Sequence, residues 1–346
     1  MRKLSSQMDS SESSNKMMAH LSHWPFMSGK IVHIEKSDTY RVYADDQSPE
    51  LLFSKACSYL AKAQDAFRPS DEASRVLLQR ELEQMMMHAI FGSNRIEGAG
   101  LGFPATEVLC QRVLRGADDS DAGGRRLDDI FAADPSLRGQ PVNSTTIRQR
   151  EVVQHTRAYL HMIHKFVVER EPMTEELIRS THEILCRDIP IIDREGHETP
   201  SKAYAGIYRT VVVAAGSTNF VVPTSVPLKM AQLCRSLQQD LAQVGASNAV
   251  DPFALAAKYS LEFVQIHPFL DGNGRLCRML LNAVLFRFVG IFAVVGEDDA
   301  DTDEYMGIKK RSSETMEGHG EYATFVLGKS VKSFRRLKQK LHGKSR

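Results

Sequence analysis

The chain has 346 residues, of which 42% are hydrophobic and 25% charged, with a formal net charge of +1. This length is enough to bury a sizeable core in one large or two smaller domains. No apolar run approaches the roughly 18 residues of a membrane span, and the first twenty residues lack the apolar centre of a secretory signal. Five cysteines without metal-ligand spacing are typical of core residues in a reducing compartment. We therefore expect a soluble protein of the cytoplasm or nucleus.

The N-terminal third divides into three segments. Residues 1–46 are expected to be disordered, with Trp24-Pro25-Phe26 as a docking point. Residues 47–116 carry helical spacing and predict N-terminal helices, the clearest at about 70–97. Residues 117–143 interrupt this pattern with Asp, Gly and Ser, and they predict a loop or an insertion.

Helical periodicity resumes over residues 144–328, which we expect to form the main domain. The remaining residues, 329–346, hold eight Lys and Arg and no acid, so the preceding 328 residues carry a formal charge of −7. This basic tail is expected either to contact an acidic partner or to be a solvated helix. The expected helices beyond the insertion are 145–170, 173–188, 226–244, 251–266, 273–289, 302–315 and 321–341.

The segment from His267 to Arg278 reads His-Pro-Phe-Leu-Asp-Gly-Asn-Gly-Arg-Leu-Cys-Arg. Pro268 ends the preceding helix because it lacks an N–H and restricts the residue before it. Gly272 and Gly274 let backbone N–H groups approach an anion, and the positive end of the next helix faces the same loop. The pattern favours a phosphate-binding loop.

The side chains of this segment suit phosphoryl or nucleotidyl transfer. A neutral imidazole at His267 can accept a proton from an attacking hydroxyl. Asp271 can hold Mg²⁺ together with phosphate oxygens, and Arg275 and Arg278 lie on one helical face within reach of a polyphosphate. Taken singly, such a histidine can be a capping residue and Gly-Asn-Gly an ordinary turn, but the combination indicates a catalytic site.

At every fixed position the run matches the motif His-Pro-Phe-x-Asp/Glu-Gly-Asn-Gly-Arg-x-x-Arg, so the chain resembles Fic-domain proteins over about residues 70–335. The resemblance implies a mainly α-helical Fic fold with its core domain at 144–328, and transfer of AMP from ATP to a Ser, Thr or Tyr hydroxyl of a target protein. It implies that His267 is the base and that Phe269 anchors the loop. It assigns Mg²⁺ or Mn²⁺ to Asp271 and ATP to Gly272, Asn273, Gly274, Arg275 and Arg278.

A second match lies at 206–216, where Gly-Ile-Tyr-Arg and the following valines are similar to the β-hairpin flap of these proteins. The β-branched run and glycine turn also predict a hairpin without the family. The resemblance implies that Val213, Ala215 and Gly216 dock the target segment as an added strand. A purely structural hairpin is the alternative.

A third match, Ser93-Asn94-Arg95-Ile96-Glu97-Gly98, resembles the inhibitory helix of many Fic proteins. Ser93 and Glu97 are four residues apart and share one helical face, and Gly98 is a good helix stop. The resemblance implies autoinhibition, with Glu97 paired to Arg278 in the place of the γ-phosphate. A solvated helix end is the alternative for so short a match.

The chain departs from the family near the base of the nucleotide. Seven residues after Tyr305, where an Asn is frequent, stands Ser312, so Tyr305 is expected to line the nucleotide pocket but base recognition is left open. Removal of AMP, another phosphate donor, and a nucleotide-binding regulator without activity are alternative functions. Target identity is not readable, and a homodimer stays open. His182 is expected to be a helix-packing residue.

Overall fold

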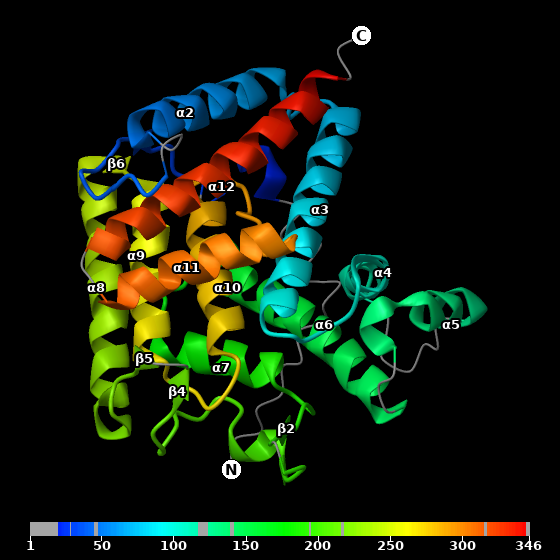
Figure 1. Cartoon of the computed structure of the whole chain (residues 1–346). Helices are drawn as coiled ribbons and strands as arrows, with labels where there is room; N and C mark the ends of the chain where they lie inside the picture. Colours follow the sequence, from blue (N-terminus) through cyan, green and yellow to red (C-terminus); the bar gives the residue numbers. More distant parts are fainter. Residues whose placement is uncertain are drawn as a thin grey trace.

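The computed structural model describes residues 20–27, 29–44, 48–116, 124–138, 142–193, 195–215, 218–314 and 317–343. Within these ranges the chain is mainly α-helical, as the Fic-fold expectation requires (Figure 1). The α-helices are α2 (Pro49–Ala66), α3 (Glu72–Ile96), α4 (Phe103–Leu114), α5 (Gly124–Ala133), α6 (Val142–Ile163), α7 (Glu175–Leu185), α8 (Val226–Ser247), α9 (Pro252–Ile266), α10 (Asn273–Val289), α11 (Asp299–Glu314) and α12 (Glu317–His342).

Short elements connect these helices. The strands form three two-stranded pairs: β1 (His33–Ile34) parallel to β6 (Ala249–Val250), β2 (Ile191–Ile192) antiparallel to β3 (Glu198–Thr199), and β4 (Ala214–Ala215) antiparallel to β5 (Thr218–Asn219). The single-turn elements are η1 (His20–His23), η2 (Pro135–Leu137), η3 (His164–Val168), η4 (Ser201–Ala203) and η5 (Pro223–Ser225). None of the helices in the described part of the chain is long and apolar enough to cross a membrane.

Helix α10 is the centre of the fold, and it packs against α9, α6 and α3. Nearly all of its residues are buried, so neighbours surround it on almost every side. Gly290 ends it in a left-handed conformation with φ 59°. The N-terminal end of α10 follows the loop that carries the histidine motif, so the core itself fixes the position of that loop.

The N-terminal segment was expected to be disordered, and for the described residues 20–27 and 29–44 this is wrong. Leu21, Trp24 and Met27 are buried, and the Trp24 indole donates to the carbonyl of Gly290 at 2.9 Å. This stretch, which has no helical or strand pattern, therefore docks because a few large apolar side chains are each buried in the core. The expectation for residues 1–19 lies outside the described part of the chain.

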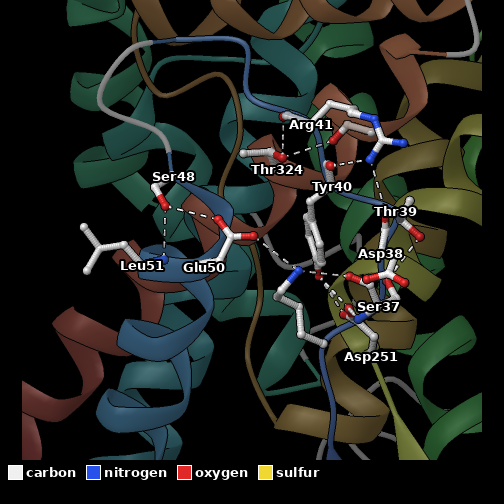
Figure 2. Close-up of polar contacts among 12 residues, drawn as sticks. Ser37, Asp38, Thr39, Tyr40, Arg41, Ser48, Glu50, Leu51, Asp251 and Thr324 are labelled. Atoms are coloured by element: carbon white, nitrogen blue, oxygen red, sulfur yellow. Dashed lines mark hydrogen bonds and ion pairs between the residues drawn. The ribbon is translucent and has the colours of Figure 1, made fainter.

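The N-terminal arm also fixes the start of α9 (Figure 2). Asp251 caps this helix by accepting from the N–H of Ala254 at 3.0 Å. The same carboxylate accepts from the Tyr40 hydroxyl at 2.7 Å and from the Ser37 N–H at 2.8 Å. Three donors thus hold the helix whose other end carries His267.

The expected insertion at 117–143 is partly helical. Helix α5 occupies 124–133, and Ile130 and Phe131 pack against the core. Packing of these two apolar side chains against the core explains why residues 124–133 form a helix where a loop was expected. Residues 117–123 and 139–141 lie outside the described residues. Helix α4, which the sequence pattern did not single out, begins at Phe103-Pro104, with proline in the first turn where its missing N–H costs nothing.

The basic tail is not a separate segment as far as residue 343. Residues 329–342 are the second half of α12, which lies beside α2 (Figure 1). Phe334, Leu337 and Leu341 are buried, at the three- and four-residue spacing of one helical face. Lys329 is buried, and the other Lys and Arg side chains of this half are exposed or half-buried, so the high density of charge did not prevent packing. Residues 344–346 lie outside the described part.

Candidate active site

The loop between α9 and α10 has a shape that its sequence explains. His267 ends α9 in a left-handed conformation, with φ 51°. Gly272 precedes α10 with φ 75°, and a Cβ there would lie 3.1 Å from Nε2 of His182 and 3.3 Å from Sγ of Cys186. Glycine at this position is therefore required by both backbone angle and space.

Two residues anchor the loop from inside. The Phe269 ring is fully buried and stacks on the imidazole of His182, with ring centroids 3.7 Å apart, which confirms its expected packing role. The Asn273 amide accepts from the N–H of Phe269 at 2.9 Å and donates to its carbonyl at 2.8 Å. The Asn273 side chain thus closes the loop on itself, whereas the family resemblance had given it to the phosphate.

His182 connects three elements and is a structural residue, as expected. Its Nδ1 accepts from the N–H of Gly206 at 2.8 Å, so its proton must be on Nε2, which donates to the carbonyl of Asp271 at 2.8 Å. Burial lowers the pKa of His182 to about 4, so the neutral form with this tautomer persists at physiological pH.

The His267 imidazole lies partly buried at the end of α9. It stacks on the Phe220 ring with centroids 3.9 Å apart and an interplanar angle of 19°. Burial, followed by the positive charge of Lys309, lowers the pKa of His267 to about 4. The ring is therefore neutral near pH 7 and able to accept a proton.

Arg209 is a functional-site residue whose role the sequence did not reveal. Its Nε donates to the carbonyl of His267 at 2.6 Å, Nη1 donates to the carbonyl of Val211 at 2.9 Å, and Nη2 donates to that of Val221. Its backbone N–H also donates to Pro268 at 2.9 Å. One buried guanidinium thus ties both arms of the hairpin segment to the histidine loop. The Gly-x-Tyr-Arg match marked the position, but local spacing carries no information about these long-range carbonyls.

Arg275 and Asp271 form an ion pair across the first turn of α10, with Nη2 2.9 Å from Oδ2. The Arg275 side chain is only 4% exposed, whereas that of Asp271 is 47% exposed. Within the described residues, Nε and Nη1 of Arg275 have no hydrogen-bond partner. Buried donors without acceptors are costly, so this arginine is prepared for an anionic ligand.

Arg278 is held by the end of α3. Its Nε donates to the Ser93 hydroxyl at 2.9 Å and its Nη2 to the Ser93 carbonyl at 3.0 Å. Nη2 also donates to Oε1 of Glu97 at 2.6 Å, and Nη1 donates to the Tyr305 hydroxyl at 3.3 Å. The structure thus brings Ser93, Glu97 and Arg278 together, as the Ser-x-x-x-Glu-Gly match had predicted.

Glu97 lies directly against the start of α10. A Cβ added to Gly274 would come within 2.0 Å of Oε1, so only glycine leaves room for this carboxylate. Burial raises the pKa of Glu97, but the charge of Arg278 and its hydrogen bond outweigh that effect, and the net pKa is lowered. An ionised carboxylate therefore occupies the positive end of the helix, where an anion is expected to bind.

The remaining predicted residues lie around this centre. Tyr305 is fully buried behind Arg278 and supports that arginine from inside the fold. Ser312 is buried, and its carbonyl accepts from Gln265 at 3.1 Å, so it belongs to the α9–α11 contact. The expected hairpin is present as β4 and β5. Val213 is half-buried and Ala215 lies in β4, while Gly216 lies outside the described residues.

Comparison with known proteins gives a family match at this site. Residues 172–285 match the model of the Fic/DOC family. A Fido domain-containing protein of Dictyostelium discoideum is 40% identical over 101 residues, which are 29% of this chain and 66% of the relative. The protein adenylyltransferase Fic of Nematostella vectensis is 31% identical over 261 residues, which are 73% of this chain and 48% of the relative.

Solved structures share the fold. A Fic domain-containing signaling protein from Bacteroides thetaiotaomicron is 20% identical, with a TM-score of 0.60, over 85% of this chain and 97% of that one. Residues 134–508 of Fic-1 from C. elegans are 17% identical, also with a TM-score of 0.60, over 86% of this chain and 73% of that one.

The chain spans 66% of the first of these curated relatives and about half of the second, so the activity of those whole proteins is for this chain a proposal. Family membership does not depend on the length of the relatives, because the family match covers the histidine loop, the hairpin and the helices that hold them. The chain belongs to the Fic/DOC family.

Proposed function

We propose that this chain is a protein adenylyltransferase that moves AMP from ATP to a Ser, Thr or Tyr hydroxyl of a target protein. The observation that carries this proposal is the arrangement at the start of α10. A neutral imidazole, a solvent-accessible carboxylate and a buried arginine with unpaired donors lie on one loop at a positive helix end. Relatives named protein adenylyltransferase support the same reaction.

His267 is the proposed general base. Its neutral ring would take the proton of the target hydroxyl while that oxygen attacks the α-phosphorus, and pyrophosphate would leave. A pKa of about 4 makes a weak base. Because the positive charge of Lys309 contributes to this low pKa, the negative charge of bound ATP would raise the pKa toward the range in which a base is effective.

Asp271 fits the proposed metal role. It is the carboxylate of the motif, its side chain is 47% exposed, and Arg275 contacts its Oδ2. Among the described residues no three His, Cys, Asp or Glu side chains form a metal cage. A single accessible carboxylate suits Mg²⁺, which takes most of its ligands from phosphates and water and would neutralise charge on the transferred phosphate.

Glu97 is the proposed inhibitor of this site. It pairs with Arg278 and lies against Gly274, so a phosphate group at the same place would lose an arginine partner and meet a carboxylate. We propose that ATP binds productively only when Glu97 leaves. The same carboxylate could orient water for attack on the AMP–protein bond, which makes hydrolytic release of AMP a second candidate function.

The hairpin segment is the proposed docking site for the target. Phe220 stacks on His267, and Arg209 ties the carbonyls of Val211 and Val221 to the histidine loop. Val212, which is 78% exposed, stands on the same arm. An extended segment of the target added along this hairpin would bring its hydroxyl to the base.

Label transfer from α-labelled and γ-labelled ATP tests the proposal. We expect Glu97→Gly to transfer the α-label to protein. Neither this variant nor the wild type should transfer the γ-label. Transfer of the γ-label would indicate a kinase-like donor reaction. Absence of both labels in folded Glu97→Gly would favour a nucleotide-binding regulator.

A further inference from the structure

One face of α3 packs against a single segment of the chain, residues 295–302, and against α12. The face consists of Glu81, Met85, His88, Gly92 and Arg95, whose alternating spacing of four and three residues puts them in one row along the helix. Glu97 follows two residues after this row. The contacts of this face therefore determine where the inhibitory carboxylate lies.

The contact is closest at Gly92. A Cβ there would come within 2.2 Å of the carbonyl oxygen of Val295. On the other side, Gly296 has φ 88°, and its Cβ would lie 2.6 Å from the carbonyl oxygen of Gly92 and 2.7 Å from Cδ1 of Ile96. Two glycines thus allow backbone to touch backbone, which leaves little freedom for α3 to shift while the contact persists.

Arg95 fastens the last turn of α3 to the same segment. Its Nη1 donates to the carbonyl of Gly296 and to the hydroxyl of Thr302, each at 3.3 Å, and its Nη2 pairs with Asp299. The Asp299 side chain is 95% exposed, so its ion pair contributes little. The carbonyl and hydroxyl bonds are the ones that hold the helix end.

The segment that receives Arg95 is itself held in shape. Asp301 accepts from the N–H of Gly296 at 2.6 Å and from that of Glu297 at 3.3 Å, and it forms an ion pair with the buried Lys329 of α12. Higher on α3, His88 contacts Glu297 at 3.0 Å. Residues 295–302 are thus braced by the core and can act as a fixed support for α3.

Glu97, in contrast, has little backbone support of its own. Its N–H bonds within the last turn of α3, to the carbonyls of Asn94 and Arg95, and Gly98 follows with φ 65°. Arg148 reaches the carbonyls of Gly98 and Gly100 from α6, so it holds the turn that follows the helix. The helix end that precedes Glu97 is held on one side by Ser93 and Asn94, which contact Arg278 and His155, and on the other side by Arg95.

We propose that Arg95 is a positioning residue for inhibition: it fixes the last turn of α3 on residues 295–302, and loss of this contact frees Glu97 from Arg278. The proposal rests on the proposed function, because the place of Glu97 matters to activity only if ATP binds at α10. It makes residues 295–302 the segment through which a partner or ligand would relieve inhibition.

Self-labelling rates with α-labelled ATP test this role. We expect Arg95→Ala to label about tenfold faster than wild type, since hydrogen bonds from a charged group contribute about that much. Arg75→Ala is the matched control, because Arg75 is an exposed arginine of α3 whose ion pair is with Glu72. Arg95→Ala combined with Glu97→Gly is expected to label no faster than Glu97→Gly alone. A wild-type rate for Arg95→Ala, beside a fast Glu97→Gly, would overturn the proposal.

Gly92→Ala gives a second variant with an independent physical basis. Alanine favours the helix by about 1 kcal/mol, yet its methyl group would meet Val295, so α3 should stay helical and leave its support. We expect Gly92→Ala to label faster than wild type. In the Glu97→Gly background, Gly92→Ala should give no further increase. Wild-type labelling by a folded Gly92→Ala protein would contradict the importance of the support.

Amide hydrogen exchange separates this proposal from the proposed function. The N–H of Ala99 donates to the carbonyl of Asn94 at 2.9 Å, so it reports on the helix end without any catalysis. We expect the amides of residues 97–99 to exchange about tenfold faster in Arg95→Ala than in wild type. In Arg75→Ala their exchange rates should equal those of wild type. Unchanged exchange would overturn the positioning role. Faster exchange without label transfer by any variant would refute the transferase and leave the role of Arg95 supported.

Discussion

Replacement of Glu97 by glutamine separates the effect of the charge of this proposed inhibitory carboxylate from the effect of its shape. Glutamine has the same length and keeps an oxygen that can accept from Arg278. Arg278 also keeps its two bonds to Ser93 at 2.9 and 3.0 Å, so the substitution leaves no orphaned arginine. The ion pair at 2.6 Å is lost, and with it the negative charge beside Gly274.

The size of the effect follows from exposure. Breaking a fully buried pair costs about 3–5 kcal/mol, but the Glu97 side chain is 35% exposed while that of Arg278 is 3% exposed. Solvent screening of the more exposed partner reduces the contribution to about 2 kcal/mol. We therefore expect Glu97→Gln to bind ATP about thirtyfold more tightly than wild type, because about 1.4 kcal/mol corresponds to a factor of ten.

Titration calorimetry with Mg·ATP measures this difference, with His267→Ala in both proteins to prevent turnover. Glu171→Gln is a matched control, since it removes a carboxylate from a surface ion pair with Lys165 at 3.0 Å. Its affinity for ATP should equal that of wild type. Equal affinities of Glu97→Gln and wild type, with both proteins folded, would refute the idea that the carboxylate competes with a phosphate.

Three further predictions concern the structural residues of the site. As the pH falls from 6.5 to 5, His182 should lower the free energy of unfolding by about 2 kcal/mol. Its pKa is about 4 in the folded protein and about 6.5 in the unfolded chain, so the unfolded chain binds the proton first. Urea titrations in which the unfolding free energies of wild type and His182→Gln fall equally with pH would contradict this. Arg209→Lys should lower the rate of label transfer about tenfold, since one ammonium cannot reach the carbonyls of His267, Val211 and Val221 together. An unchanged rate would show that this connection between the hairpin and the histidine loop is not needed for activity. Phe269→Ala should cost about 4 kcal/mol in urea unfolding, and a cost under about 1 kcal/mol would show that the ring is no anchor.

The histidine loop could be read from sequence because local rules govern it, whereas the contact between Glu97 and Arg278 was implied by the family resemblance. Pro268 and Gly272 dictate where α9 ends and α10 begins, and they do so through their own backbone preferences. Spacing alone predicted that Ser93 and Glu97 share a helical face, and the resemblance paired Glu97 with Arg278. The structure brings them to Arg278.

The missed features depend on contacts between distant parts of the chain. Tyr40 and Ser37 dock because Asp251, more than 200 residues later, accepts from both, and nothing near Tyr40 in sequence indicates this. Arg209 has the same character, since its acceptors are backbone carbonyls that any residue could supply. Periodicity also gave no sign that the basic half of α12 would pack against α2.

Intact-protein mass spectrometry of two variants tests the central claim most directly. Glu97→Gly and Glu97→Gly with His267→Ala would each be incubated with ATP and Mg²⁺. We predict that the first protein gains the mass of AMP and that the second does not, because it lacks the base at the end of α9. No gain by the folded first variant, or an equal gain by both, would contradict the account.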